Sequence, residues 1–146
     1  MKSGYYLATV INAYRRLMDG GEFSISDKEL ANVAHRDYTT AYMLGDNSQT
    51  VNYLDSQSKG DYVYIADVVG MENGYVLAEM RNRFKSGELL EVLSPDENFG
   101  KSFLAEEIFD HNGEKTDDAK LVQEIYKIKC PYDLKKGDYI RRKKAE

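Results

Sequence analysis

Cysteine, proline and tryptophan are scarce in this chain of 146 residues, which contains one cysteine, two prolines and no tryptophan. A single cysteine, Cys130, can neither close a disulfide within the chain nor supply a multi-cysteine metal site. The two histidines, His35 and His111, lie far from each other and from Cys130 in the sequence, so the ligand spacing of a zinc site is missing. These absences favour a reducing compartment, and we expect a cytoplasmic protein with no metal in this chain.

Long apolar runs are also missing. No stretch approaches the roughly 18 consecutive apolar residues that cross a bilayer, so the sequence predicts no transmembrane helix. The first six residues lack the charged region followed by an apolar stretch that marks a signal peptide. We therefore expect no membrane partner.

No complete catalytic constellation is present in the sequence. Cys130 precedes Pro131 and has no histidine beside it that would lower the pKa of a nucleophilic thiol. Glu106 and Glu107 are adjacent on a predicted strand and point to opposite faces, so they cannot act as a paired acid and base. The serine motif of hydrolases and a phosphate-binding glycine loop are missing too. We therefore expect that the chain is not itself catalytic, and a protease activity of the chain alone is the hypothesis with the least support.

The net charge of −5 is distributed unevenly along the chain. Residues 61–123 carry 14 acidic and 6 basic side chains, a net charge of −8, whereas residues 124–146 carry 4 acidic and 8 basic side chains, a net charge of +4. Such an asymmetry can mark an interaction surface. The alternative is a basic terminal segment that is only a solvated edge.

The first segment has the periodicity of an amphipathic helix. Ser3 can cap its start, and Asp19-Gly20-Gly21 is a typical helix end. The apolar face is broad, and the rest of the chain offers little surface against which to bury it. We expect this face to self-associate through residues 5–18 or to pack on the following domain. Its apolar residues, spaced by three and four, are Tyr6, Leu7, Val10, Ile11, Tyr14, Leu17 and Met18.

A second, shorter helix is predicted to begin at Ser26. Ser26 and Glu29 have the spacing of a capping box, in which each side chain accepts a hydrogen bond from a free backbone N–H at the helix start. Residues 46–61 are polar and rich in turn-forming residues, and a loop of this length is uncommon inside a compact domain. We therefore place a helical segment at residues 1–45 and treat residues 46–61 as a linker.

The periodicity changes from helical to alternating after residue 61. Asn73-Gly74 is a strong hairpin signal, because both central positions of a type I′ turn need a positive φ. Short strands separated by turn residues are typical of a sandwich or barrel, and about six strands favour a small closed barrel. The predicted fold class is therefore α+β, with a short helical segment followed by a small antiparallel β-barrel at residues 62–146. The predicted strands are residues 62–69, 75–80, 89–93, 103–109, 125–130 and 139–140.

Two groups of polar residues, mostly basic, are the candidate binding residues. Planar guanidinium groups suit phosphate recognition, and aromatic side chains provide stacking surfaces for bases. Tyr62, Tyr64, Tyr126 and Tyr139 are the tyrosines available for stacking on the predicted barrel. The alternative is that the arginines form ion pairs with the many carboxylates of the barrel. The candidates for RNA or ligand binding are Arg81, Asn82, Arg83, Arg141, Arg142, Lys143 and Lys144.

Three stretches have residues in a recognisable order and spacing. The most specific is Glu79-Met80-Arg81-Asn82-Arg83-Phe84, followed by Gly87-Glu88, Glu91, Pro95, Gly137-Asp138 and Arg141-Arg142. The other two are residues 1–15 and the group His35-Arg36 with Tyr38-Thr39-Thr40. Together they resemble the C-terminal portion of peptidase family U32, the collagenase-like group, over nearly the whole chain. Ala41 and Ala66 depart from the pattern, because relatives commonly have glycine there.

The resemblance implies a β-barrel like the second domains of translation factors for residues 62–146 and the tail of an upstream catalytic domain for residues 1–45. We expect the body of that domain to precede Met1 in a longer protein. The family includes proteins similar to RNA hydroxylation enzymes that act on transfer or ribosomal RNA. Their catalytic cysteines, including iron–sulfur ligands, lie in the upstream domain, so neither a catalytic residue nor a cofactor carries over to this chain.

Two hypotheses follow for the function. The first is a non-catalytic accessory domain that positions substrate for an upstream U32 catalytic domain, with transfer or ribosomal RNA as partner and the basic residues as phosphate contacts. The second is a protein-interaction or structural module that orients the catalytic domain or an oligomer, in which case the arginines form surface ion pairs. The acidic segment 61–123 argues against strong RNA binding by the chain alone.

Overall fold

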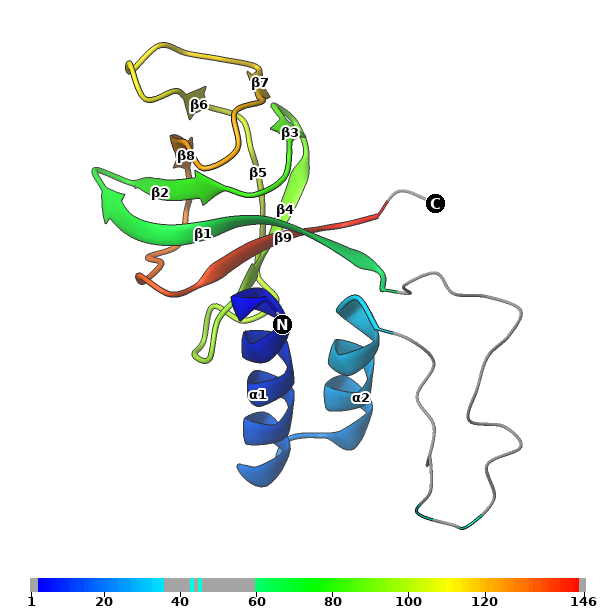
Figure 1. The fold of residues 1–146 in the computed structure, drawn as a ribbon. Coiled ribbons are helices and arrows are strands. Elements are labelled where there is room, and N and C mark those ends of the chain that lie inside the picture. The colour runs from blue at the N-terminus through cyan, green and yellow to red at the C-terminus, as the bar shows by residue number, and fades with distance from the viewer. Residues whose placement is uncertain (1–2, 36–42, 44, 46–59, 145–146) are drawn as a thin grey trace. The chain divides into compact units, whose positions relative to one another are not determined.

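The computed structural model describes residues 3–35, 43, 45 and 60–144, and Figure 1 shows its helices and its sheet. Contacts between Cα atoms divide the chain into two compact units, Met1–Asp61 and Tyr62–Glu146. Of the predicted linker 46–61, only residues 60 and 61 are described, and residues 36–41, with most of the second motif and Ala41, lie outside the described part.

Helix α1 (Gly4–Met18) begins and ends where the sequence predicts. The Ser3 hydroxyl accepts a hydrogen bond from the backbone N–H of Tyr6 at 3.2 Å and caps the start of the helix. After the last turn, Gly20 adopts a φ of 89°, a left-handed conformation typical of a helix end. The side chains that α1 buries are Tyr5, Thr9, Asn12 and Ala13.

Another side of α1 carries large apolar side chains that are exposed. Leu7, Ile11, Tyr14 and Met18 are spaced by four, three and four residues, so they form one row along the helix. Their exposed fractions are 51%, 62%, 57% and 82%. We call these four residues the apolar stripe. The stripe belongs to the broad apolar face that the sequence predicts, and it is uncovered in the described structure.

Helix α2 (Phe23–Asn32) begins three residues before the predicted start. Its N-cap is Glu22, whose side chain makes no capping hydrogen bond, so the predicted capping box of Ser26 and Glu29 is wrong. The buried Ser26 hydroxyl instead donates to the backbone carbonyl oxygen of Ala13 in α1 at 3.0 Å. A contact between the two helices thus decides the role of this serine. Neither α1 nor α2 is long and apolar enough to span a bilayer.

The β unit is built around a seven-stranded antiparallel sheet with the strand order β5-β4-β9-β1-β2-β8-β6, and β3 and β7 form a separate two-stranded ribbon. Side chains such as Ile65, Val76 and Ile140 are buried in one apolar core. The α+β fold class is confirmed, and β3 and β7 are additional to the predicted strands. The strands are β1 (Tyr62–Glu72), β2 (Tyr75–Met80), β3 (Phe84–Lys85), β4 (Leu89–Leu93), β5 (Ser102–Leu104), β6 (Ile108–Phe109), β7 (Asp118–Ala119), β8 (Ile125–Lys129) and β9 (Tyr139–Lys143).

Strands β5 and β6 are the two edges of the sheet, and both belong to one extended segment, residues 102–109. β5 pairs with β4, and β6 pairs with β8. Between them, the backbone N–H of Ala105 donates to the Glu88 carbonyl oxygen, and the N–H of Lys129 donates to the Glu107 carbonyl oxygen, both at 3.0 Å. This bent segment, predicted as a single strand, therefore links both edges, and the sheet curls into a barrel-like shape (Figure 1).

Two further features of the sheet bear on the site. Asn73 and Gly74, between β1 and β2, have φ values of 51° and 83°, as the predicted type I′ turn requires. Strand β9 pairs with β1 on one side and with β4 on the other, so it lies inside the sheet and not at its edge. The strand predicted at residues 139–140 is thus longer, and it carries the candidate residues Arg141, Arg142 and Lys143.

Candidate nucleic-acid interface

Arg141 is buried within the β unit, with 1% of its surface exposed. Its Nε and one terminal nitrogen donate to Glu91 Oε1 at 2.8 and 2.5 Å. The guanidinium lies 4.3 Å from the centre of the Tyr62 ring, and the Tyr62 hydroxyl donates to Glu91 Oε2 at 2.9 Å. Arg141, Glu91 and Tyr62 therefore join β9, β4 and β1. Because its guanidinium is engaged and covered, Arg141 does not offer a phosphate contact in this structure.

Arg81 and Asn82 fasten the chain after β2 to β1. Arg81 Nε donates to Asp67 Oδ2 at 2.6 Å, and a terminal nitrogen lies 3.1 Å from a Glu79 carboxylate oxygen. The Asn82 amide donates to the Tyr64 carbonyl oxygen at 2.6 Å, and the Tyr64 hydroxyl donates to Asp67. Burial raises the pKa of Tyr64, and the hydrogen bond to Asp67 raises it further. Both carboxylates next to Arg81 compete with any phosphate for its charge.

The basic side chains at the end of β9 are more accessible than Arg141. Arg142 forms an ion pair with Glu88, and both side chains remain about 30% exposed. Lys143 and Lys144 are exposed and form no ion pair with any residue that the structure describes. Lys143 lies opposite Tyr62 in the register of β9 with β1.

Arg83 directly precedes β3, and its side chain bonds to β7. Its Nε donates to Asp118 Oδ1 at 2.8 Å, and a terminal nitrogen donates to Oδ2. Lys120 Nζ lies 3.8 Å from the same carboxylate. The hydrogen bond from Arg83 lowers the pKa of Asp118, and the charges of Arg83, Lys120 and Lys85 add to this effect. We call Arg83, Lys85, Asp118 and Lys120 the ribbon face.

Sequence reasoning selected Arg83 but missed Lys85 and Lys120. The signal was present, because Arg83-Phe84-Lys85 and Asp118-Ala119-Lys120 both alternate charged and apolar residues, as a half-buried strand does. Two-residue strands are too short for such a pattern to stand out.

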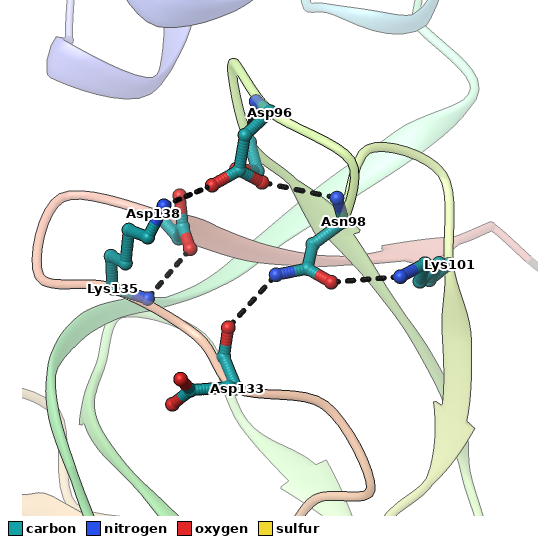
Figure 2. A network of polar contacts seen from close by, with 7 residues as sticks. Asp96, Asn98, Lys101, Asp133, Lys135 and Asp138 are labelled. Atoms are coloured by element: carbon teal, nitrogen blue, oxygen red, sulfur yellow. Dashed lines mark hydrogen bonds and ion pairs between the residues drawn. The ribbon is translucent and has the colours of Figure 1, made fainter.

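A polar network joins the loop between β4 and β5 to the loop between β8 and β9 (Figure 2). Asp96 Oδ1 accepts hydrogen bonds from the Asn98 backbone N–H at 3.0 Å and the Ser94 hydroxyl at 2.7 Å. Lys135 Nζ donates to Asp96 Oδ2 at 2.8 Å, and the Asn98 amide donates to the Asp133 carbonyl oxygen at 2.8 Å. The bond from Lys135 is the main reason that the pKa of Asp96 is lowered. The donors and acceptors of this network bond to one another, so the network holds the two loops together.

The described surface of the β unit contains hollows, one of which adjoins the ribbon face. One, of about 280 Å³, lies beside the ribbon face and shares Asp118 and Lys120 with it. Its other walls are Asp110, His111, Thr116, Leu121, Glu124 and Tyr126. A larger one, of about 610 Å³, lies where the β1–β2 turn meets β5 and the end of β8. Its apolar walls include Tyr75, Phe103, Leu104, Cys130 and Pro131.

Comparison with known proteins places the β unit in a family. The family model of the peptidase family U32 C-terminal domain matches residues 60–141, which is more than half of the chain. The chain belongs to peptidase family U32. The match spans the Arg81–Phe84 motif and reaches Arg141 in β9, so the sheet and its buried arginine fall within the family domain.

Relatives agree with this assignment. The tRNA hydroxylation protein P1 of Bacillus subtilis (strain 168) is 29% identical over 156 residues, which cover 99% of this U32 chain and 36% of that protein. The chain thus spans about a third of the length of this curated relative. Two crystal structures show the C-terminal domain of a Geobacillus thermoleovorans protein assigned to the U32 peptidases. Their sequences are 24% and 26% identical to this chain, and each structure has a TM-score of 0.51. The matches cover 55% and 56% of this chain, and 99% and 92% of the two crystallised chains.

Cys130 does not make this U32 chain a cluster-binding protein by itself. The thiol is buried just after β8, and burial raises its pKa. An iron–sulfur cluster is held by several cysteine thiolates, and this chain has one cysteine. Within the part of the chain that the structure describes, no three His, Cys, Asp or Glu side chains are grouped to hold a metal ion. The residues present therefore do not fit such a cluster.

Proposed function

We propose that this chain is a non-catalytic accessory domain of a U32 protein and that its exposed basic residues contact RNA. The end of β9 carries the proposal, because Lys143 and Lys144 are exposed there without an ion pair to any described residue. Tyr62 lies opposite Lys143 at this end of the strand, where its ring covers the Arg141 guanidinium. The name of the curated relative, a tRNA hydroxylation protein, supports RNA as the class of partner.

The seven candidate residues are not equally suited to this role. Arg141 is buried, and Arg81 lies between two carboxylates. Arg83 and Arg142 are also paired, but with 58% and 30% of their side chains exposed. An exposed ion pair contributes only about 0–1 kcal/mol, so a phosphate can replace its carboxylate partner at little cost. We therefore propose Arg83, Arg142, Lys143 and Lys144 as the phosphate contacts.

A fluorescence titration with structured transfer RNA tests this proposal. The full chain should bind at low salt, and Lys143→Gln/Lys144→Gln should weaken binding and reduce the salt dependence of log K by about 1–2, since two phosphate contacts are lost. The matched control is Lys127→Gln/Lys136→Gln, which removes the same charge elsewhere on the β unit. Absence of binding by the full chain at low salt would contradict the proposal, and so would equal losses in the two variants.

We also propose that the chemistry of the whole protein belongs to a catalytic domain preceding this region in U32 proteins. The curated relative is almost three times as long as its match to this chain, which leaves room for such a domain. Any iron–sulfur cluster would be held there, because Cys130 alone does not provide its ligands. In this arrangement the accessory domain holds RNA while the catalytic domain acts on it, in the cytoplasm.

The apolar stripe favours a second function, which is docking. Its four side chains are half exposed or more, and monomeric proteins seldom expose a contiguous row of large apolar residues without a binding role. We propose that the stripe packs on the upstream domain or on a second copy of the chain. The chain would then also orient the catalytic domain or an oligomer of the protein.

Sedimentation of the full chain tests the docking function. Ile11→Glu/Tyr14→Glu places two charges in the stripe and should abolish self-association, or complex formation with a separately produced U32 catalytic domain. Lys28→Glu, on an exposed position of α2, is the control for an added acidic residue. A monomeric full chain that also forms no complex with the catalytic domain would remove the support for docking.

A further inference from the structure

The ribbon face collects cations from two segments that are more than thirty residues apart in the sequence. Phe84 pairs with Ala119 and Lys85 pairs with Asp118 in the antiparallel register. Phe84 and Ala119 are buried, so the residues on either side of them point away from the core. Continuing this register by one residue sets Arg83 opposite Lys120.

One of the two charged pairs is unfavourable for stability. Lys85 lies opposite Asp118, a pair of opposite charges, whereas Arg83 lies opposite Lys120, and like charges directly opposite each other across two strands are destabilising. Asp118 offers one negative charge and engages Arg83 through both of its carboxylate oxygens, which leaves an excess of two positive charges on the ribbon face. Arg83 and Lys120 are also well exposed, at 58% and 66%. The ribbon face thus carries an excess of cations in a segment whose net charge is −8, as an anion-binding surface does.

The hollow beside the ribbon face supplies a second element of a site. It shares Asp118 and Lys120 with the ribbon face, so a ligand can reach both. Its volume of about 280 Å³ is close to the lower limit for small-molecule pockets, roughly 300 Å³. Tyr126 forms a wall, with its hydroxyl accepting the backbone N–H of Leu121 at 3.2 Å. A flat aromatic group fits the size and the partly apolar walls of this hollow.

Polar groups in the hollow favour hydrogen-bond donors on that aromatic group. Glu124 Oε2 lies 3.0 Å from His111 Nδ1, and the second carboxylate oxygen of Glu124 has no hydrogen bond to any described residue. Asp110 Oδ1 accepts backbone N–H groups of its own turn, from Asn112 and Glu114 at 2.9 Å each. Carboxylate oxygens accept hydrogen bonds from exocyclic amino groups of bases, which uracil lacks.

We propose that the ribbon face and the adjoining hollow bind one nucleotide of single-stranded RNA, with its phosphate at Arg83, Lys85 and Lys120 and its base in the hollow. The inference rests on the proposed contact with RNA and names a site for it apart from the end of β9. Bases that carry an exocyclic amino group, such as adenine and cytosine, are preferred over uracil. Asp118 holds the Arg83 guanidinium in place beside the phosphate.

The test is a titration of the full chain with fluorescent ten-nucleotide RNAs made of A, C or U alone, at low salt. Lys85→Gln/Lys120→Gln should weaken binding of the A and C oligonucleotides at least about tenfold, because two phosphate contacts are lost. Lys127→Gln/Lys136→Gln should change affinity much less, although it removes the same charge. Lys85→Arg/Lys120→Arg keeps the charges and should retain binding, which shows that the site tolerates substitution.

Further variants and ligands distinguish binding at the ribbon site from binding elsewhere on the chain. Glu124→Gln should reduce the preference for A and C over U without abolishing binding. If Lys143→Gln/Lys144→Gln removes binding while Lys85→Gln/Lys120→Gln does not, RNA contact stands and the ribbon site is wrong. If the full chain binds no RNA, the proposed function fails together with this site. Calorimetry with inorganic phosphate distinguishes the source of the anion, because phosphate binding as tight as oligonucleotide binding would overturn the assignment to RNA.

Discussion

Arg141 is the largest side chain that the β unit buries almost completely, and its charge is balanced by Glu91 and covered by the Tyr62 ring. Removing one partner of a buried ion pair leaves an uncompensated charge. We expect Arg141→Ala to lower the free energy of unfolding by about 3 kcal/mol, measured by urea denaturation. The control is Arg142→Ala, whose side chain is partly exposed, and a loss no larger than that of the control would contradict a structural role for Arg141.

Asp96 gives a prediction for the dependence of stability on pH. Hydrogen bonds from Lys135, Asn98 and Ser94 lower its pKa in the folded chain below the ordinary value of about 3.9. Its contribution to stability is therefore complete above that ordinary value and is lost as the pH falls through the lowered value. Asp96→Asn should make the free energy of unfolding less dependent on pH between about 5 and 2, measured by denaturation at several pH values. An unchanged pH dependence would show that the network of Figure 2 does not stabilise the ionised carboxylate.

The residues also show how far sequence reasoning reaches. It found the basic residues of β9, because a run of arginine and lysine is visible in the sequence. It did not separate Arg141 from Lys143, because the burial of Arg141 depends on Glu91, fifty residues away in the sequence. Ser26 is a similar case, since its hydroxyl bonds to α1 and not to its own helix. Contacts over long sequence distances decide both roles.

At the scale of elements, the turn between α1 and α2 is tightly built. A Cβ atom on Gly21 would lie 2.7 Å from the backbone carbonyl oxygen of Arg16, which cannot move without distorting α1. We expect Gly21→Ala to destabilise the helical unit by about 1–3 kcal/mol, measured as loss of helical circular dichroism on heating. Gly70→Ala is the control, because its nearest contact would be a Leu77 side-chain carbon at 3.9 Å. Equal effects of the two substitutions would contradict the importance of this close approach.

The elements that sequence reasoning found are those with a clear periodicity of apolar residues or a distinctive turn. Helix α1 and the hairpin of β1 and β2 are in this group, since Ser3 and Asn73-Gly74 act locally. The ribbon was missed because strands of two residues are too short to show an alternation of apolar and polar residues. The bend at residues 105–107 was also missed, because it results from pairing with both edges of the sheet.

At the scale of the whole molecule, the two compact units predict two separate unfolding events. The β unit contains its own apolar core, and a crystallised C-terminal domain of a U32 relative matches only about half of this chain. We expect residues 60–146, produced without the helical unit, to fold cooperatively with the melting temperature of the β transition in the full chain. Calorimetry of both proteins checks this, and an unfolded fragment would show that the sheet depends on the helices.

The position of β9 inside the sheet also determines when the β unit can form during protein synthesis. Until residues 139–143 have left the ribosome, β4 and β1 have no strand between them, and the two parts of the sheet are joined only through the segment 102–109. The β unit can therefore close only after Lys143 has emerged, and the incomplete sheet exposes unpaired strand edges in the meantime. A nascent chain that stops before Tyr139 should be captured by chaperones or degraded, whereas a chain that includes β9 closes its own sheet.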